Sequence, residues 1–305
     1  MNKLTVPAAA LLIALSACQS SQKNVDTNKP LKLPAFNKEG HRGARGLMPE
    51  NTIPAMYAGI DHDVNSVEVD VVISKDRKVV ISHDLYFHQD FSLTPDGKEM
   101  DGKEAQLHQL YTMDYDSIRK YDVGLKPHKD FPQQKKIAAY KPLLSDLIDS
   151  TEAYARKLNK PIIYNIELKT NASFDGTKQP PVEETVDLVM QIVREKKIED
   201  HCYLQSFDFR PLQILNRKYP DITTAVLIGG NDPRTFEQQL TDLGYTPEMY
   251  SPHYSVVTAE LVKKCHDRNI KLIPWTVNTL EEMKKLKELG VDGIITDYPN
   301  YFAEL

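Results

Sequence analysis

Cysteine and tryptophan are scarce in this chain, which has three cysteines and one tryptophan among its 305 residues. Cys18 lies close to the N-terminus, so the rest of the chain has only Cys202 and Cys265. No CxxC pair and no Cys/His spacing of the zinc-binding type occurs, which excludes a metal site built on such a motif. Export would permit a disulfide between the two later cysteines, but we expect buried free thiols instead.

Positive charge is also in short supply. The chain has 38 Lys and Arg residues against 43 Asp and Glu residues, a formal net charge of −5. This balance argues against a nucleic-acid-binding protein, which needs a basic face. It also means that an anionic ligand must be held by local groups. The composition, 41% hydrophobic and 27% charged, is typical of a soluble globular protein, and the length allows one large domain or two ordinary ones.

The hydrophobic run near the N-terminus is short. Val6 to Leu15 follows Lys3 and is too short to span a bilayer as a permanent helix. The sequence Leu15-Ser16-Ala17-Cys18 resembles the lipobox of bacterial lipoproteins, in which the cysteine is lipidated and becomes the mature N-terminus. The alternative is an ordinary cleaved signal peptide with an incidental cysteine. We therefore expect a signal peptide at residues 1–17, a lipidated polar tether at 18–36, and a lipid anchor on the periplasmic or extracellular face of a bacterial envelope.

From residue 37 onward, segments typical of strands alternate with segments typical of helices. The expected strands are Lys38–Gly43, Ser66–Ile73, Pro161–Leu168, His201–Phe207, Ile222–Ile228, Met249–His253, Ile270–Val277 and Val291–Thr296. The expected helices are Thr52–Asp61, Leu143–Asn159, Val182–Lys197, Pro211–Lys218, Pro233–Leu243, Ala259–Arg268 and Leu280–Leu289. Eight strands in this alternation favour a (β/α)8 TIM barrel over residues 37–305 rather than a doubly wound sheet.

One connection is too long for this pattern. Asp84 to Pro142 contains turn signals, several aromatic residues and no convincing strand. We expect a small insertion subdomain at about residues 85–142.

The stretch from His41 to Asp84 concentrates residues suited to chemistry. Glu68 and Asp70 lie two apart on one expected strand and therefore share a face. Glu167 lies on the next barrel strand, so three carboxylates would meet at the barrel mouth, where they repel one another without a cation. An all-oxygen site suits Mg²⁺ or Ca²⁺. The alternative is that each carboxylate pairs with a lysine or faces solvent.

Two histidines accompany these acids. His41 and His83 each end an expected strand, and imidazole titrates near neutral pH, so one can accept a proton while the other donates one. Asp84 follows His83 directly and, as its neighbour on a strand, would point the other way. Arg42 can donate two hydrogen bonds to a phosphoryl group, and Lys169 shares a strand face with Glu167, whose charge it could also simply neutralise.

These motifs occur in a recognisable order. They are His41-Arg42-Gly43, Pro49-Glu50-Asn51-Thr52, Glu68-Val69-Asp70, His83-Asp84, Asn165-Ile166-Glu167-Leu168-Lys169, Trp275-Thr276-Val277-Asn278 and Asp292-Gly293-Ile294-Ile295-Thr296-Asp297. The set resembles the glycerophosphodiester phosphodiesterase family from about residue 37 to the C-terminus. The resemblance implies a TIM barrel with an insertion over the catalytic mouth. It also implies metal ligation by Glu68, Asp70 and Glu167 and a catalytic pair formed by His41 and His83.

The resemblance implies hydrolysis of glycerophosphodiesters to an alcohol and sn-glycerol 3-phosphate with one divalent cation, Ca²⁺ or Mg²⁺. Arg42 and Lys169 would bind the phosphate, and Trp275, if not simply part of the core, would line the pocket for the glycerol. The attacking group could be water or the vicinal glycerol hydroxyl, and either histidine could be the acid. Two alternatives stay open: phospholipase D-like action on intact phospholipid, and a non-catalytic surface lipoprotein that binds a ligand.

Overall fold

The computed structural model describes Met1 and residues 31–305. The expected signal peptide, Cys18 and most of the expected tether lie outside the described residues. Among the helices that are described, none is both long and apolar enough to cross a membrane.

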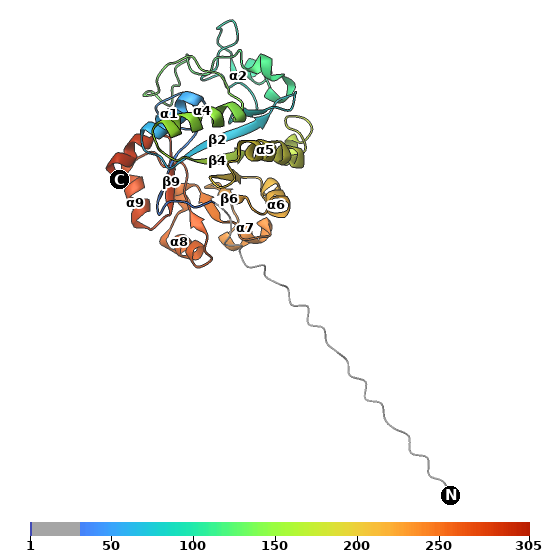
Figure 1. Ribbon diagram of the computed structural model, residues 1–305, viewed down its shortest axis with the longest axis vertical. Coiled ribbons are helices and arrows are strands. Elements are labelled where there is room, and N and C mark those ends of the chain that lie inside the picture. Colours follow the sequence, from blue (N-terminus) through green and yellow to red (C-terminus); the bar gives the residue numbers. More distant parts are fainter. Residues whose placement is uncertain (2–30) are drawn as a thin grey trace.

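A ring of parallel strands forms the centre of the molecule (Figure 1). The strands are β1 (Asn37–Gly40), β2 (Ser66–Ile73), β4 (Ile163–Leu168), β5 (Cys202–Ser206), β6 (Thr223–Ile228), β7 (Met249–Pro252), β8 (Lys271–Leu272) and β9 (Gly293–Thr296). Their order is β8-β7-β6-β5-β4-β2-β1-β9. The expectation of a (β/α)8 barrel is confirmed.

The ring closes between the segment around β8 and the strand β9. The backbone bonds that join them run from Asp292 N to Leu272 O (2.9 Å), from Ile295 N to Pro274 O (3.0 Å) and from Val277 N to Ile295 O (2.9 Å). β8 itself is much shorter than the expected strand Ile270–Val277. Pro274 lies within that segment and has no N–H to donate to a ladder, so the regular pairing stops before it.

Seven helices follow the strands and cover the outside of the ring (Figure 1). They are α1 (Ile53–Asp61), α4 (Leu144–Lys157), α5 (Val182–Lys196), α6 (Phe209–Lys218), α7 (Phe236–Leu243), α8 (Ala259–His266) and α9 (Leu280–Glu288). Short 3₁₀ helices are η1 (Leu110–Thr112), η2 (Ala172–Phe174), η3 (Tyr254–Val256) and η4 (Pro299–Glu304). The main hydrophobic core lies between the strands and the inner faces of the helices, and each fully buried aliphatic side chain there stabilises the fold by about 1.5–3 kcal/mol.

Cys202 on β5 and Cys265 on α8 are buried free thiols, as expected. Burial raises the pKa of both thiols, that of Cys265 to about 12. The two side chains therefore act as small apolar residues of the core.

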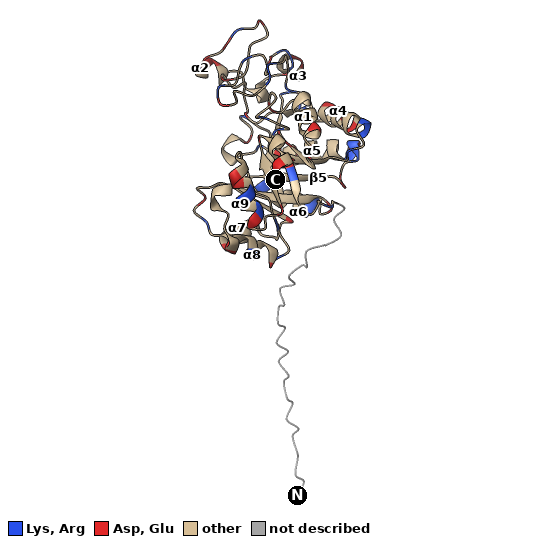
Figure 2. Ribbon diagram, turned by 90° about the vertical axis from the view of Figure 1, so that its left-hand side faces the viewer, with Lys and Arg blue, Asp and Glu red and all other residues tan. Residues whose placement is uncertain are grey.

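The long connection after β2 forms a subdomain with its own small core. Strand β3 (Val79–Ile81) ends two residues before His83, where the sequence placed the strand end. It pairs antiparallel with the end of β2 and leads the chain away from the barrel. Helices α2 (Gly102–Ala105) and α3 (Tyr115–Ile118) follow, and both views place this part at one end of the molecule (Figures 1 and 2). The core consists of Val72, Val80, Phe87, Phe91, Met100, Ala105, Leu110, Tyr115, Ile118, Tyr121 and Val123.

This subdomain is attached to the loop that follows β1. Gln134 donates from its side-chain amide to the carbonyl of Arg45 (2.8 Å), and the backbone N–H of Lys135 donates to the carbonyl of Leu47 (2.9 Å). The guanidinium of Arg45 lies 4.6 Å from the centre of the Phe131 ring. Since this loop leaves the C-terminal end of β1, the subdomain lies beside the end of the barrel where such folds carry their active sites.

Candidate active site

The chain turns sharply just after β1. The strand ends at Gly40, three residues earlier than expected, because Arg42 and Gly43 have φ angles of 49° and 84° and cannot continue a strand. Gly43 has no room for a side chain, since a Cβ atom there would lie 2.6 Å from the backbone carbon of Ala55. The turn places His41 and Arg42 at the mouth of the barrel.

Three carboxylates converge inside this mouth. Glu68 and Asp70 project from β2 and Glu167 from β4, with Asp70 directly opposite Glu167 in the parallel register. One oxygen of each lies within 4.8 Å of the others, and all three side chains are buried. The structure therefore brings together the three residues that the sequence singled out as ligands.

The environment of these carboxylates fits a divalent cation. Glu68 Oε1 and Asp70 Oδ1 are buried and have no hydrogen-bond partner among the described residues, which is costly for charged oxygens unless a ligand satisfies them. Burial and the charge of Asp70 raise the pKa of Glu68 well above its usual value, and burial also raises that of Glu167. A cation bound to these hard oxygen ligands would reverse both shifts and relieve the repulsion.

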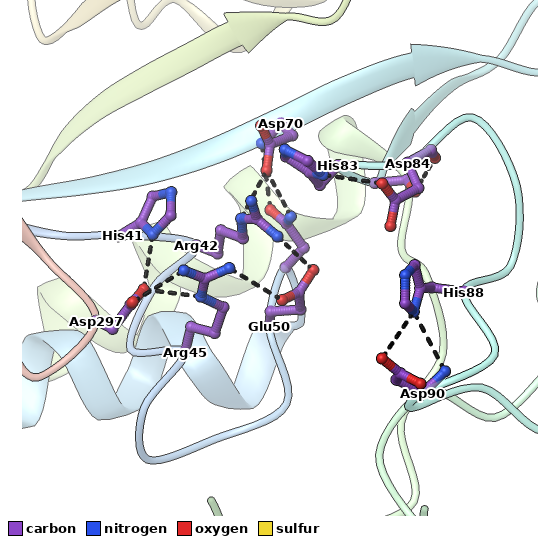
Figure 3. Close-up of polar contacts among 12 residues, drawn as sticks. His41, Arg42, Arg45, Glu50, Asp70, His83, Asp84, His88, Asp90 and Asp297 are labelled. Atoms are coloured by element: carbon purple, nitrogen blue, oxygen red, sulfur yellow. Dashed lines mark hydrogen bonds and ion pairs between the residues drawn. The ribbon is translucent and has the colours of Figure 1, made fainter. Parts of the chain in front are cut away.

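Arg42 is held firmly against this group (Figure 3). Its backbone N–H donates to Glu68 Oε2 (2.8 Å), and Nη1 of its guanidinium donates to Glu50 Oε1 (2.8 Å). Its Nε lies 3.4 Å from Asp70 Oδ2 without a proper hydrogen bond, so one buried donor is unsatisfied within the described residues. Arg42 also lines the cavity in the mouth, where an anion would accept hydrogen bonds from its guanidinium.

Lys169 supplies a second cation from the end of β4. Its Nζ donates to Glu167 Oε1 (2.6 Å) and lies 3.6 Å from Asp70 Oδ1. Although burial alone would raise the pKa of Asp70, Lys169 and Arg42 lower it below its usual value, so this carboxylate is ionised. Neutralisation of Glu167 by Lys169, which the sequence left open, does occur.

His41 is fixed from behind by Asp297, which follows β9 directly. Its Nδ1 lies 2.7 Å from Asp297 Oδ1 (Figure 3). Its Nε2 is directed to the acidic group, 3.9 Å from Glu68 Oε2. Burial outweighs the attraction of Asp297 and lowers the pKa of His41 to about 4. The imidazole is therefore neutral at physiological pH. Its Nδ1–H donates to Asp297 and its Nε2 can accept a proton.

His83 makes the contact that the sequence argued against. Its Nδ1 lies 3.0 Å from Asp84 Oδ1, and Figure 3 shows the two side chains next to each other. Adjacent side chains point to opposite faces only where the chain is a strand. Strand β3 ends at Ile81, and the chain bends at His83 and Asp84, so the expectation that Asp84 points away from His83 was wrong. Burial alone would raise the pKa of Asp84, but the hydrogen bond from His83 outweighs this effect and lowers the pKa to about 2.

Sequence reasoning missed several supporting residues. Asp297 also accepts bonds from Arg45 Nε (2.8 Å) and Asn278 Nδ2 (2.7 Å). Asn51 donates to Asp70 Oδ2 (2.8 Å), while its neighbour Thr52 caps α1. Asp297 could have been found, because it directly follows an expected strand and so must lie at the same mouth as His41.

Two cavities meet at Glu167, which lines both of them. The inner one, of about 140 Å³, lies over the barrel mouth between His41 and Arg42 on one side and Phe207 and Trp275 on the other. The outer one, of about 400 Å³, lies between the subdomain and the segment after β4. Both are lined by His83, Glu167, Lys169 and Phe207, so they are two compartments of a single site. Trp275 contacts Phe207 edge to face at 5.2 Å, and its Nε1 donates to the carbonyl of Ser251 (2.9 Å).

A family model described as the glycerophosphoryl diester phosphodiesterase family matches residues 41–301. The chain belongs to this family. It is 30% identical over 268 residues to the uncharacterized protein YqiK of Bacillus subtilis, covering 87% of this chain and 96% of that protein. It is 26% identical over 265 residues to a glycerophosphodiester phosphodiesterase of Caldanaerobacter subterraneus, covering 87% and 95%.

Solved structures agree with this assignment. A Silicibacter pomeroyi protein described as a glycerophosphoryl diester phosphodiesterase superposes with a TM-score of 0.77 at 29% identity, over 90% of this chain and 94% of that one. An Oleispira antarctica phosphodiesterase in complex with sn-glycerol 3-phosphate shares the fold with a TM-score of 0.68 at 21% identity, over 89% and 96%. The protein is thus a phosphodiester hydrolase with a buried acidic group of the kind that divalent cations bind.

Proposed function

We propose that the protein hydrolyses glycerophosphodiesters to an alcohol and sn-glycerol 3-phosphate with the help of one divalent cation, Ca²⁺ or Mg²⁺. The observation that carries this proposal is the acidic group, in which Glu68 Oε1 and Asp70 Oδ1 make no hydrogen bond within the described residues and Glu167 lines both cavities. The product complex of the Oleispira antarctica relative supports the choice of product.

Glu68, Asp70 and Glu167 would hold the cation. When bound, it supplies Lewis-acid polarisation of the phosphoryl group and offsets the negative charge that builds up during the reaction. The all-oxygen donor set is the reason for choosing Ca²⁺ or Mg²⁺ over zinc.

His41 is suited to act as the general base. Asp297 accepts its Nδ1–H, so the lone pair at Nε2 faces the inner cavity and the ring is neutral. It would take the proton of the attacking hydroxyl, which belongs to water or to the vicinal position of the substrate's own glycerol.

His83 is suited to act as the general acid. It lines both cavities, whereas His41 lines only the inner one, so His83 lies where the alcohol separates from the phosphate. The Asp84 carboxylate beside its Nδ1 stabilises the imidazolium, and the opposite nitrogen would donate the proton to the departing oxygen.

The remaining side chains of the site would bind two parts of the substrate, the phosphate and the glycerol. Arg42, whose buried Nε makes no hydrogen bond within the described residues, and Lys169 would stabilise negative charge on the phosphoryl oxygens. Trp275 and Phe207 would form the apolar wall for the glycerol, whose size suits a cavity of about 140 Å³.

Action on an intact phospholipid is supported less well. Such a substrate calls for a broad apolar surface around the mouth. Among residues 31–305 the exposed large apolar side chains are Leu107, Leu125, Tyr140, Leu158 and Phe207, and of these only Phe207 lines either cavity. A non-catalytic binding protein is also disfavoured, since every acid, base and ligand position is filled.

We also propose that Cys18 is lipidated and anchors the enzyme to the outside of a bacterial membrane, on the basis of Leu15-Ser16-Ala17-Cys18. Mass spectrometry of the mature protein should find an acylated cysteine at its N-terminus. A product cleaved elsewhere would contradict this.

The activity is tested by measuring release of glycerol 3-phosphate from several glycerophosphodiesters, before and after chelation and after addition of Mg²⁺ or Ca²⁺. Activity should disappear with chelator and return with one of the two cations. Full activity after exhaustive chelation would overturn the metal assignment, and no release from any diester would overturn the function.

A further inference from the structure

We infer that the outer cavity receives the departing alcohol and selects polyhydroxy alcohols without positive charge over ammonium alcohols such as choline. This inference rests on the proposed function. His83 lines both cavities and so lies at their boundary. If glycerol and phosphate occupy the inner cavity, the ester bond to the departing alcohol points past His83 into the outer cavity. Its volume of about 400 Å³ leaves room for an alcohol larger than glycerol.

The uncompensated charge in the outer cavity is positive. Lys178 lies in its wall and forms no ion pair with any carboxylate of residues 31–305; its Nζ lies over the ring of Phe174 at 4.8 Å. The two acids of the wall are already engaged, Asp84 by His83 and Glu167 by Lys169. An entering cation would therefore meet a lysine without a free carboxylate to compensate it.

The aromatic rings do not provide an alternative site for a cation. Ammonium groups bind over the faces of aromatic rings. The ring of Phe174 is covered by Lys178, and that of Phe207 lies 5.9 Å from Lys169 Nζ. Tyr86, the third ring of the wall, stacks with His88 at 6.1 Å. A choline group placed here would lie beside an ammonium of the same charge.

Hydroxyl groups find suitable partners in the same wall. Gln106, Gln109 and Asn171 contribute carboxamides, each with two N–H donors and one carbonyl acceptor. Gln109 uses one donor on the carbonyl of Gln106 (3.3 Å), and the side-chain oxygen of Asn171 accepts from Ser173, which leaves further donors and acceptors for a ligand. Both subdomain and barrel thus contribute groups that recognise an uncharged polyol.

The test compares kcat/KM for glycerophosphoinositol and glycerophosphocholine in the metal-loaded, full-length enzyme. The wild type should prefer the inositol diester. Lys178→Glu reverses the charge at the wall and should shift the ratio of the two kcat/KM values toward choline by about tenfold. This figure adds two effects of a partly exposed charge pair, the loss of a repulsion and the gain of an attraction. Lys178→Met should shift it in the same direction by less.

Lys284→Glu on α9 is the matched control, because it changes the net charge equally at an exposed position outside the cavity. It should leave the ratio unchanged. A wild type that prefers choline, or a ratio that Lys178→Glu and Lys178→Met do not move, would overturn the inference while the proposed function stands. Failure to cleave either diester would overturn the proposed function and the inference with it.

Discussion

Asp297→Asn should impair the base without removing a metal ligand or a phosphate contact. The carboxylate of Asp297 accepts the Nδ1–H of His41 at 2.7 Å, which leaves Nε2 free to take a proton. An asparagine amide can donate its own N–H to Nδ1 instead, which moves the imidazole proton to Nε2 and blocks that role. The loss of the negative charge also lowers the pKa of His41 further.

The size of the effect follows from the bond that is lost. A hydrogen bond to a charged group is worth about 1.5–3 kcal/mol, which corresponds to a loss of roughly 10- to 150-fold in kcat. KM should change little, because Asp297 is screened from the cavity by His41 and Arg45, which do line it.

Steady-state kinetics on a glycerophosphodiester and on its p-nitrophenyl counterpart would measure this effect. Both substrates should be affected, because a better leaving group does not replace a base. Asp232→Asn is a matched control, since Asp232 likewise binds an arginine, Arg234 Nη2 at 2.6 Å, but lies away from the site before α7.

Thermal unfolding of both variants separates loss of stability from loss of catalysis. The reasoning would be refuted if folded Asp297→Asn kept kcat within about twofold of the wild type, or if it lost no more than Asp232→Asn.

Three further predictions concern the metal, the acid and stability. Glu167→Gln removes one anionic ligand, so the Mg²⁺ or Ca²⁺ concentration for half-maximal activity should rise about tenfold; an unchanged titration would argue against ligation. His83→Ala should lose about 10²- to 10⁴-fold in kcat/KM on an alkyl diester and recover on a p-nitrophenyl diester, which departs without a proton; equal loss on both would exclude the acid role. Glu152 raises the pKa of His201. A histidine whose pKa is higher in the folded than in the unfolded protein stabilises the fold at pH values below its unfolded pKa, about 6.5. This stabilisation is lost as the pH rises through the pKa of the folded protein. The melting temperature of His201→Ala should therefore lie below that of the wild type at pH 5 and approach it at pH 9, and equal differences at both pH values would contradict the ion pair.

Local patterns were sufficient to predict the barrel and the acidic group. Strand and helix signals depend on neighbouring residues, and a closed ring of parallel strands brings all their C-terminal ends to one mouth. That rule alone places Glu68, Asp70 and Glu167 together, because a strand directs alternate side chains to the same face. The roles of these residues as ligands stay predictions.

Where a strand stops was beyond the reach of these patterns. Arg42 and Gly43 leave the β region because the turn after β1 must pass close to α1, and Pro274 interrupts the ladder at β8. Asp84 was misjudged for the same reason, since the strand alternation used to direct it away from His83 does not extend past Ile81.

The partners of the catalytic side chains were decided only by the tertiary structure. His41 and Asp297 are 256 residues apart in the chain, and Arg42 meets Glu50 only because the turn after β1 folds back on itself. The division of the site into an inner and an outer cavity likewise depends on how the subdomain packs beside the segment after β4. Sequence patterns report the conformation of neighbouring residues, whereas pKa shifts and cavities depend on burial and on charges that only the packed chain brings within a few ångströms.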